Sequence, residues 1–205
     1  MKPLRIALTK GRLEQKTIEL FESKNIECTS LHDKGRKLIF SIDNGAAEVL
    51  LVKPADVITY VEHGICDMGI VGKDTIMEHG HSFYEIADLG FGKCRMALAG
   101  YPQDFYSGYK KRVVATKFEK IAREYFSKKN VDIETIKIEG SVEVAPILGF
   151  ADAIVDIVET GTTLKENGLV VLEYICDISA RLIVNTAAMK MRKKEVSAFA
   201  GRLGL

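Results

Sequence analysis

The chain has 205 residues, of which 47% are hydrophobic and 28% charged, a balance typical of one large or two small soluble globular domains. Its 29 lysines and arginines are matched by 28 acidic residues, so the net charge of +1 argues against nucleic-acid binding through bulk charge. No apolar stretch of about 18 residues occurs, and the N-terminal apolar run is too brief for a secretory signal. We therefore expect a cytoplasmic protein without a membrane helix.

The N-terminal part of the chain alternates predicted strands and helices. Strands are expected at 4–8, 36–42, 48–52 and 67–71, with helices beginning after 12, at 54 and after 74. The pair Asn44-Gly45 predicts a hairpin between the second and third strands. Pro54 suits the first position of a helix, because its missing N–H has no partner there in any case.

Two basic glycine turns each follow a predicted strand and precede a predicted helix. They are Lys10-Gly11-Arg12 and Gly72-Lys73-Asp74. In α/β folds the carboxyl ends of parallel strands are where ligands bind, so both turns are candidate binding loops. For the first of these turns, a solvated loop is the alternative.

The pattern changes around Phe91, where Gly90 and Gly92 flank an aromatic residue and indicate a crossing into a second domain. Further strands are predicted at 94–99, 112–115, 134–138, 153–158, 169–178 and 180–185, and helices at 117–128, 142–148 and from 186 onward. The last strand is expected to return to the first domain. The sequence thus predicts an α/β fold of two lobes with mostly parallel sheets and an interdomain cleft. Domain I is expected at 1–91 plus 179–205, and domain II at 92–178.

The stretch 150–169 carries the strongest local signal for a ligand. A buried strand is followed by the run Thr160-Gly161-Thr162-Thr163, and Thr163 with Glu166 has the spacing of a capping box. A strand, a Gly/Thr turn and a helix N-terminus together offer backbone N–H groups, hydroxyls and a helix dipole to a phosphate. Asp152 and Asp156 suit the hydroxyls of a sugar. A plain capped turn remains the alternative, since neither GxxxxGK[ST] nor GxGxxG is present.

The cysteines give no indication of a metal centre. Cys28, Cys66, Cys94 and Cys176 are scattered, with no CxxC motif and no spacing typical of zinc ligands. We expect buried free thiols in a reducing cytoplasm, and the sequence leaves any protein ligand of a metal unknown.

Four segments together carry a family resemblance. They are Lys10-Gly11-Arg12, VGKD at 71–74, DLGFGKCR at 88–95 and GSVEVAPILGFADAIVDIVETGTTLKENGL at 140–169. From residue 4 to about residue 191 the chain resembles ATP phosphoribosyltransferase, and within that family the catalytic subunit of the short form. The resemblance implies a fold like the type II periplasmic binding proteins. It also implies the first step of histidine biosynthesis, in which N1 of ATP attacks C1 of phosphoribosyl pyrophosphate (PRPP) with inversion and releases pyrophosphate.

The resemblance further implies a cofactor and partners. Family members need Mg²⁺, and long forms carry an additional C-terminal regulatory domain that we expect to be missing here. Short forms instead form homodimers that pair, in a hetero-octamer, with a regulatory subunit resembling histidyl-tRNA synthetase. No nucleic acid or membrane is implied as a partner.

The resemblance also assigns the candidate site residues. Catalytic roles fall on Arg12, Arg36 and Lys53, although the family usually has arginine where Lys53 stands. PRPP binding is assigned to Glu139, Ser141, Asp152, Asp156, Glu159, Thr160, Gly161, Thr162 and Thr163, so that domain II is the ribose-phosphate-binding domain. ATP or pyrophosphate binding is assigned to Lys10, Gly11, Gly72, Lys73 and Asp74.

Structural roles are the alternatives for several of these residues. Asp156 suits a structural hydrogen bond, Glu143 a helix cap, and Arg36 a solvated strand edge. For the whole chain, a cytoplasmic small-molecule sensor with the same lobed fold is the alternative function. A phosphoribosyltransferase with a Rossmann-like core is disfavoured, because its two acids are usually adjacent and here they are four residues apart.

Overall fold

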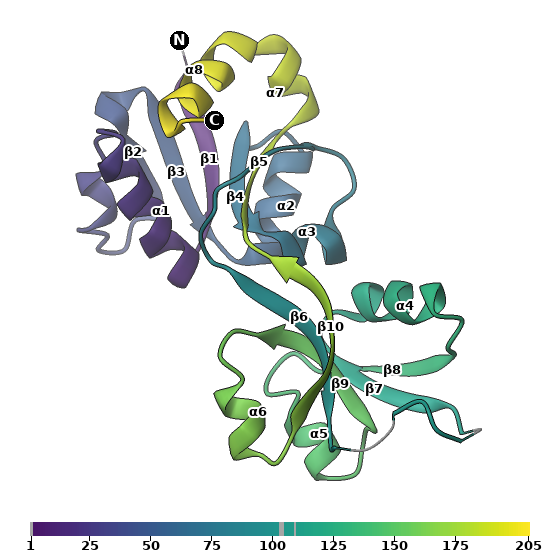
Figure 1. Cartoon of the computed structure of the whole chain (residues 1–205). Helices are drawn as coiled ribbons and strands as arrows, with labels where there is room; N and C mark the ends of the chain where they lie inside the picture. The colour runs from purple at the N-terminus through teal and green to yellow at the C-terminus, as the bar shows by residue number, and fades with distance from the viewer. Residues whose placement is uncertain (1, 103–104, 109) are drawn as a thin grey trace. The chain divides into compact units, whose positions relative to one another are not determined.

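The computed structural model describes residues 2–102, 105–108 and 110–205, which divide into two compact units (Figure 1). Unit 1 is Met1–Gly92 with Ser179–Leu205, and unit 2 is Lys93–Ile178. The crossings at 92–93 and 178–179 fall within one residue of the domain limits expected from the sequence.

Unit 1 is a six-stranded sheet in the order β2-β3-β1-β4-β11-β5. The strands are β1 Leu4–Thr9, β2 Ile39–Ile42, β3 Ala47–Val52, β4 Met68–Gly72, β5 Tyr84–Asp88 and β11 Ala180–Val184. The helices are α1 Arg12–Ser23, α2 Pro54–Glu62, α3 Lys73–His79, α7 Thr186–Met191 and α8 Lys193–Leu203, with the short turns η1 Thr29–Leu31 and η2 Asp43–Gly45.

Both faces of this sheet are buried, because successive strand residues point to opposite sides. On one face Ile6 and Leu8 join a core that contains Phe21 of α1 and Phe199 of α8, and the two rings meet edge to face at 5.8 Å. On the other face Ala7 packs with residues of α2. Unit 1 is therefore a sheet between two layers of helices.

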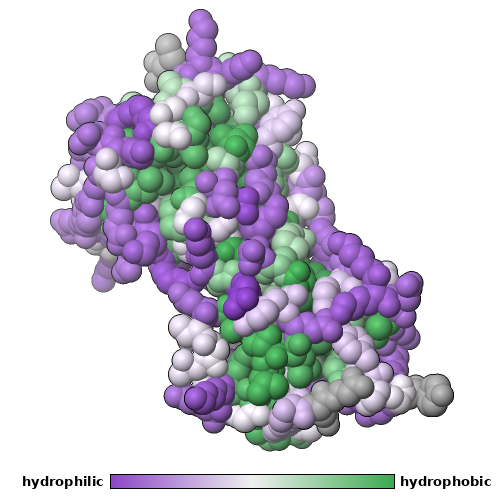
Figure 2. Space-filling model, viewed as in Figure 1, coloured by the Kyte–Doolittle hydropathy of each residue, from purple (hydrophilic) through white to green (hydrophobic). Residues whose placement is uncertain are grey.

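Helix α1 is amphipathic and fits this arrangement. Thr17, Ile18 and Phe21 are buried, whereas the charged residues Arg12, Lys16, Glu19 and Glu22 are exposed. The hydrophilic area over α1 is visible in Figure 2, viewed as in Figure 1. The helix packs by its apolar stripe, whereas its N-terminus stays accessible at the carboxyl end of β1.

Unit 2 is a five-stranded sheet in the order β10-β6-β9-β7-β8. The strands are β6 Cys94–Gly100, β7 Arg112–Thr116, β8 Ile133–Lys137, β9 Ala153–Val158 and β10 Val170–Ile178. The helices are α4 Glu119–Lys128, α5 Val144–Ile147 and α6 Thr162–Glu166. Ile154 of β9 packs with Val142, Ala145 and Leu164 on the face that carries α5 and α6.

The two sheets share one strand order, and both are mixed. In unit 1 the parallel strands lie in the order β3-β1-β4, and β11 pairs antiparallel with β4. In unit 2 the parallel strands lie in the matching order β8-β7-β9, and β6 pairs antiparallel with β9. β11 and β6 are the strands next to the crossings between the units. The expectation of mostly parallel sheets was therefore wrong in this detail, since a strand entering from the other unit runs against its neighbours.

Four local expectations need correction. The strand predicted at 36–42 begins only at Ile39, and β5 was missed. The C-terminal helix is two helices, because Arg192 between them has φ −123° and ψ 27°. The Thr163–Glu166 capping box is absent: α6 begins at Thr162 and Gly161 occupies the N-cap in a left-handed conformation with φ 75°.

No helix within the described part of the chain combines the length and the apolar character that crossing a membrane requires.

Candidate active site

The threonine loop (residues 160–163) follows the carboxyl end of β9 in unit 2. Gly161 takes the positive φ that starts α6, a conformation glycine adopts without the cost a side chain brings. The hydroxyls of Thr160 and Thr162 are 3.0 Å apart, and Thr162 N–H donates to Thr160 Oγ1 at 3.4 Å. Gly161 has no side chain to cap the helix, so the N–H groups that begin α6 and the neighbouring hydroxyls suit an anion.

A cavity of about 220 Å³ adjoins the threonine loop. Its lining includes the whole loop together with three carboxylates, Glu143, Asp156 and Glu159. Glu143 stands at the N-cap of α5 without a side-chain capping bond, so the capping interpretation of this residue fails. Hydroxyls and amides beside carboxylates are the donor and acceptor set that a sugar phosphate requires.

Glu139 and Ser141 follow β8, two strands away from β9 in the sheet, and do not line this cavity. Glu139 is exposed and pairs with Lys137 at 2.9 Å. Both residues nevertheless share the carboxyl edge of the sheet with the threonine loop, because β7, β8 and β9 are parallel.

Asp152 does not belong with the threonine loop. It precedes β9, whereas the loop follows β9, so roughly 20 Å of extended strand separates the two. Its carboxylate accepts a hydrogen bond from Val113 N–H at 2.8 Å and pairs with Arg112 at 3.4 Å. The expected grouping of Asp152 with Asp156 on one sugar was therefore wrong: Asp152 fastens the start of β7 to β9.

The basic turn (residues 10–12) occupies the carboxyl end of β1 in unit 1. Lys10 and Arg12 are exposed, and Gly11 adopts φ 95° as the N-cap of α1. Gly11 N–H donates to Glu14 Oε2 at 3.1 Å, and the same buried carboxylate pairs with Lys34 at 2.5 Å. Sequence reasoning missed Glu14, although its place three residues after the N-cap is the signal of a capping box.

Arg36 and Lys53 lie at the same edge of the sheet as the basic turn. Lys53 directly follows β3, which runs parallel to β1 with Thr9 opposite Val52. Arg36 lies in the loop before β2, and β2 is antiparallel to β3, so its start adjoins the end of β3. Both side chains are exposed, and four cationic residues thus meet along one edge.

Gly72 ends β4 and forms the N-cap of α3. A Cβ on Gly72 would lie 2.1 Å from Asp74 Oδ1, so glycine is needed for Asp74 to fold back over the turn. Lys73 Nζ pairs with Glu85 at 2.5 Å, and Arg181 also pairs with Glu85, at 3.2 Å. The charge of Lys73 is therefore partly neutralised within unit 1.

Comparison with known proteins decides the family. The model of the family described as ATP phosphoribosyltransferase matches residues 53–204. The chain belongs to the ATP phosphoribosyltransferase family. The resemblance inferred from the sequence motifs is confirmed, and the chain is an enzyme of phosphoribosyl transfer.

Curated relatives carry the same name. The chain is 58% identical over 194 residues to an ATP phosphoribosyltransferase of Clostridium kluyveri, covering 94% of this chain and 89% of the relative. It is 60% identical over 199 residues to that of Clostridium botulinum, covering 96% and 94%.

Two solved structures are similar to the chain. The ATP phosphoribosyl transferase (HisG:HisZ) complex from Thermotoga maritima matches with a TM-score of 0.84 and 32% identity, covering 98% of this chain and 96% of that one. The alkanesulfonate-binding protein SsuA from Xanthomonas axonopodis pv. citri matches with a TM-score of 0.59 and 11% identity, covering 99% and 72%. The second likeness concerns the fold alone, and it agrees with the expected type II periplasmic-binding-protein-like architecture.

Proposed function

We propose that the threonine loop of unit 2 binds the 5-phosphate of PRPP, and that the basic edge of unit 1 binds polyphosphate. The observation that supports this most directly is the cavity lined by residues 160–163 together with Asp156, Glu143 and Glu159. Hydroxyls and helix N–H groups suit the phosphate, and the carboxylates suit the ribose hydroxyls. Asp152 is not part of this proposed binding site, because its carboxylate joins the start of β7 to β9.

The reaction needs charge stabilisation more than proton transfer. N1 of the adenine ring forms a bond to C1 of the ribose while the C1–O bond to pyrophosphate breaks, and the electron pair leaves with pyrophosphate. Positive charge grows on the ribose ring, where Asp156 would stabilise it. Negative charge grows on the leaving group, to which Lys10, Arg12, Arg36 and Lys53 offer cations. Gly72 and Asp74 extend this edge toward the ATP.

Mg²⁺ fits the donor set of this proposal. Carboxylate oxygens and substrate phosphates are the ligands this ion prefers, and Asp156, Glu159 and Glu143 supply such oxygens beside the threonine loop. When bound, Mg²⁺ would neutralise charge on the leaving pyrophosphate. The residues of the chain would hold the ion close to the sugar and keep the ribose in place.

We propose for this chain a partner subunit like that of the similar solved structure. The similar structure from Thermotoga maritima is a HisG:HisZ complex, and this chain covers 96% of the matched subunit. We therefore propose that homodimers of the chain work in a hetero-octamer with a regulatory subunit that resembles histidyl-tRNA synthetase. The buried thiols of Cys28 and Cys66 suit a reducing compartment, which supports a cytoplasmic enzyme. The sensor alternative is not favoured, because the likeness to SsuA carries only 11% identity.

Replacing both Thr162 and Thr163 by alanine tests the phosphate assignment. Two charge-assisted hydrogen bonds lost from the phosphate, at roughly 1.5–3 kcal/mol each, should together raise the KM for PRPP about a hundredfold or more. The KM for ATP should change by less than about twofold, since ATP is assigned to unit 1. Phosphoribosyl-ATP formation is measured with ATP, PRPP, Mg²⁺ and pyrophosphatase, with and without the partner subunit.

Thr59→Ala is the matched control, because Thr59 is exposed on α2 and its hydroxyl donates to Ala55 O of the same helix at 3.3 Å. Unchanged PRPP kinetics in the double variant would refute the phosphate assignment. Absence of phosphoribosyl-ATP from the parent protein, even with the partner, would refute the activity of this chain.

A further inference from the structure

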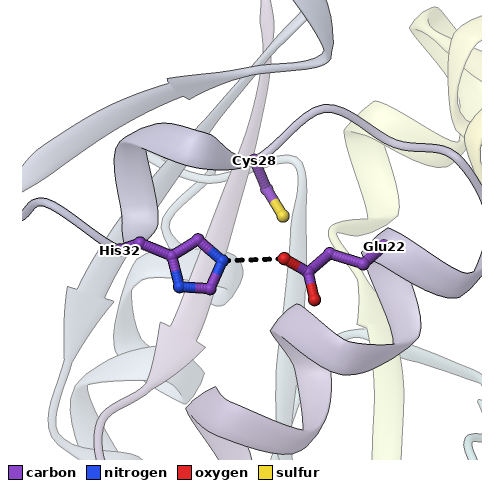
Figure 3. A group of neighbouring side chains, drawn as sticks. All are labelled: Glu22, Cys28 and His32. Carbon is purple, nitrogen blue, oxygen red and sulfur yellow. Dashed lines mark hydrogen bonds and ion pairs between the residues drawn. The ribbon is translucent and has the colours of Figure 1, made fainter.

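Glu22, Cys28 and His32 form a group of side chains in unit 1 that the proposed reaction does not use (Figure 3). Glu22 lies in the last turn of α1, and Cys28 and His32 lie immediately before and after η1. One ligand atom of each lies within 4.8 Å of those of the other two, and His32 Nε2 is 2.7 Å from Glu22 Oε1. In Figure 3 the thiol points toward the carboxylate.

The backbone around this group is held by hydrogen bonds. Leu31 N–H donates to Cys28 O at 2.9 Å and His32 N–H donates to Thr29 O at 3.0 Å, which closes one tight turn. The hydroxyl of Ser30 donates to Ser41 O at 2.7 Å and so fastens the turn to β2. The spacing of Cys28 and His32 is therefore fixed before any ligand arrives, which lowers the entropic cost of binding.

We propose that Glu22, Cys28 and His32 bind a divalent transition-metal ion of the zinc type. Thiolate, imidazole and carboxylate are the three ligand types that Zn²⁺ uses in proteins, and a tetrahedral ion held by three of them keeps a fourth position for water. The donor set is too soft for Mg²⁺, which prefers oxygen. The site is thus distinct in its chemistry from the carboxylates beside the threonine loop.

The geometry needs only a small adjustment. With bonds of about 2.0–2.3 Å to a tetrahedral ion, the ligand atoms would be about 3.3–3.7 Å apart. The side chains of Glu22 and His32 are 53% and 56% exposed, so both can change rotamer while the buried Cys28 stays in place. The ion would take the place of the proton between Glu22 and His32, and it would enter from solvent.

A thiol, an imidazole and a carboxylate can also form a nucleophilic triad. That use requires a substrate to reach the sulfur atom, and Cys28 is only 3% exposed. A metal ion needs no such space, because it approaches from the side of the exposed Glu22 and His32. Burial of the thiol thus favours the metal over the nucleophile.

Metal titration of the full-length, untagged chain without substrates tests the proposal. After treatment with a chelator, the chain is titrated with Co²⁺ and then Zn²⁺. We expect one Co²⁺ per chain with tetrahedral visible bands and a thiolate-to-metal charge-transfer band, all displaced by Zn²⁺. Saturating Zn²⁺ should also raise the Tm, because the ion binds only the folded chain.

Cys28→Ser, His32→Gln and Glu22→Gln should each weaken Zn²⁺ binding by tenfold or more, since ligand loss costs at least what loss of a supporting residue costs. Cys176→Ser and His63→Gln are the matched controls and should stay within about twofold of the parent. Glu22 and His32 lie on the surface, so their variants remain informative even if Cys28→Ser unfolds. Parent affinity in those two variants, or a Co²⁺ complex without the charge-transfer band, would overturn the proposal.

Discussion

A single buried carboxylate, that of Glu14, fixes the backbone of the basic turn. It accepts the hydrogen bond of Gly11 N–H and pairs with Lys34, while its side chain is only 8% exposed. Arg12 follows Gly11 directly, so the orientation of the Arg12 side chain depends on the hydrogen bond between Gly11 and Glu14. Glu14 is thus a positioning residue that acts through the turn.

Replacement of Glu14 by alanine should cost about 1–3 kcal/mol in unfolding free energy, because it leaves the Gly11 N–H and the Lys34 ammonium without their acceptor. Turnover should fall as well, since Arg12 loses its fixed orientation. Urea unfolding and steady-state kinetics measure the two effects. Glu14→Gln should recover part of the turnover, because the amide oxygen still accepts from Gly11 N–H.

Glu19→Ala is the control on the same helix, where Glu19 pairs with Lys16 at 2.9 Å and is 61% exposed. An exposed pair of this kind contributes about 0.5 kcal/mol or less, so stability and turnover should stay near those of the parent. Equal losses in the two variants would show that Glu14 has no special connection to the turn.

At the residue scale, the position of a residue could be predicted from the sequence when the end of the preceding strand was clear. Thr160 and Lys10 follow strands whose carboxyl ends the apolar runs mark, and they lie at those ends. Asp152 and Asp156 looked equivalent because both are acids in one apolar run. Direction along the strand separates them: Asp152 precedes β9 and is bonded to β7, whereas Asp156 lies toward the carboxyl end of β9.

Glu173, Lys129 and Tyr125 connect α4 to β10 in unit 2. Lys129 and Tyr125 both donate hydrogen bonds to the Glu173 carboxylate. Burial alone would raise the pKa of Glu173, but the hydrogen bonds from Lys129 and Tyr125 outweigh it and lower that pKa. Burial, together with the hydrogen bond to Glu173, raises the pKa of Tyr125 to about 12. These three side chains join a helix to the edge strand of its sheet.

Glu173→Gln should therefore change how stability depends on pH. A carboxyl group with a lowered folded pKa stabilises above its ordinary pKa of 4.5, and this contribution disappears as the pH falls through the folded pKa. We expect the variant to lose about 1 kcal/mol at pH 7 and to match the parent in acid. Urea unfolding of the full chain from pH 3 to 8, followed by circular dichroism, measures this.

Glu124→Gln, an exposed change on the same helix, should lower stability by the same small amount at every pH. If Glu173→Gln gave a constant difference from the parent across that range, the hydrogen-bonded carboxylate would not be the source of the effect.

At the element scale, long apolar runs with clear turns were predictable and short mixed segments were not. The range of β9 was predicted without error, because six apolar-rich residues lie between turn signals. β5 was missed because its residues are half exposed and their pattern is mixed. Gly161 replaced Thr163 as the N-cap because its positive φ lets the helix begin two residues earlier, at Thr162.

At the scale of the whole molecule, the order of the strands decides which part of the chain can fold alone. Every strand of the unit 2 sheet comes from one continuous segment, Lys93–Ile178. The unit 1 sheet instead needs β11, which lies between β4 and β5 and is contributed by the segment after the second crossing. Apart from β5, sequence periodicity identified these strands but not their order, because pairing partners leave no local signal.

We therefore predict that residues 93–178, expressed alone, fold cooperatively, whereas residues 1–92 do not. The first fragment keeps all five strands and the helices α4, α5 and α6, and with them the threonine loop. The second fragment lacks β11, so β5 loses the strand it pairs with and β4 loses one of its two partners.

Urea unfolding and amide-proton NMR dispersion measure folding, and a 1–92 fragment joined by a flexible linker to 179–205 is the matched control. That control should regain a cooperative transition, because the return strand restores the order of the sheet. A cooperative transition in 1–92 alone would mean that the inserted strand is dispensable, and an unfolded 93–178 would mean that unit 2 depends on contacts outside its own sheet.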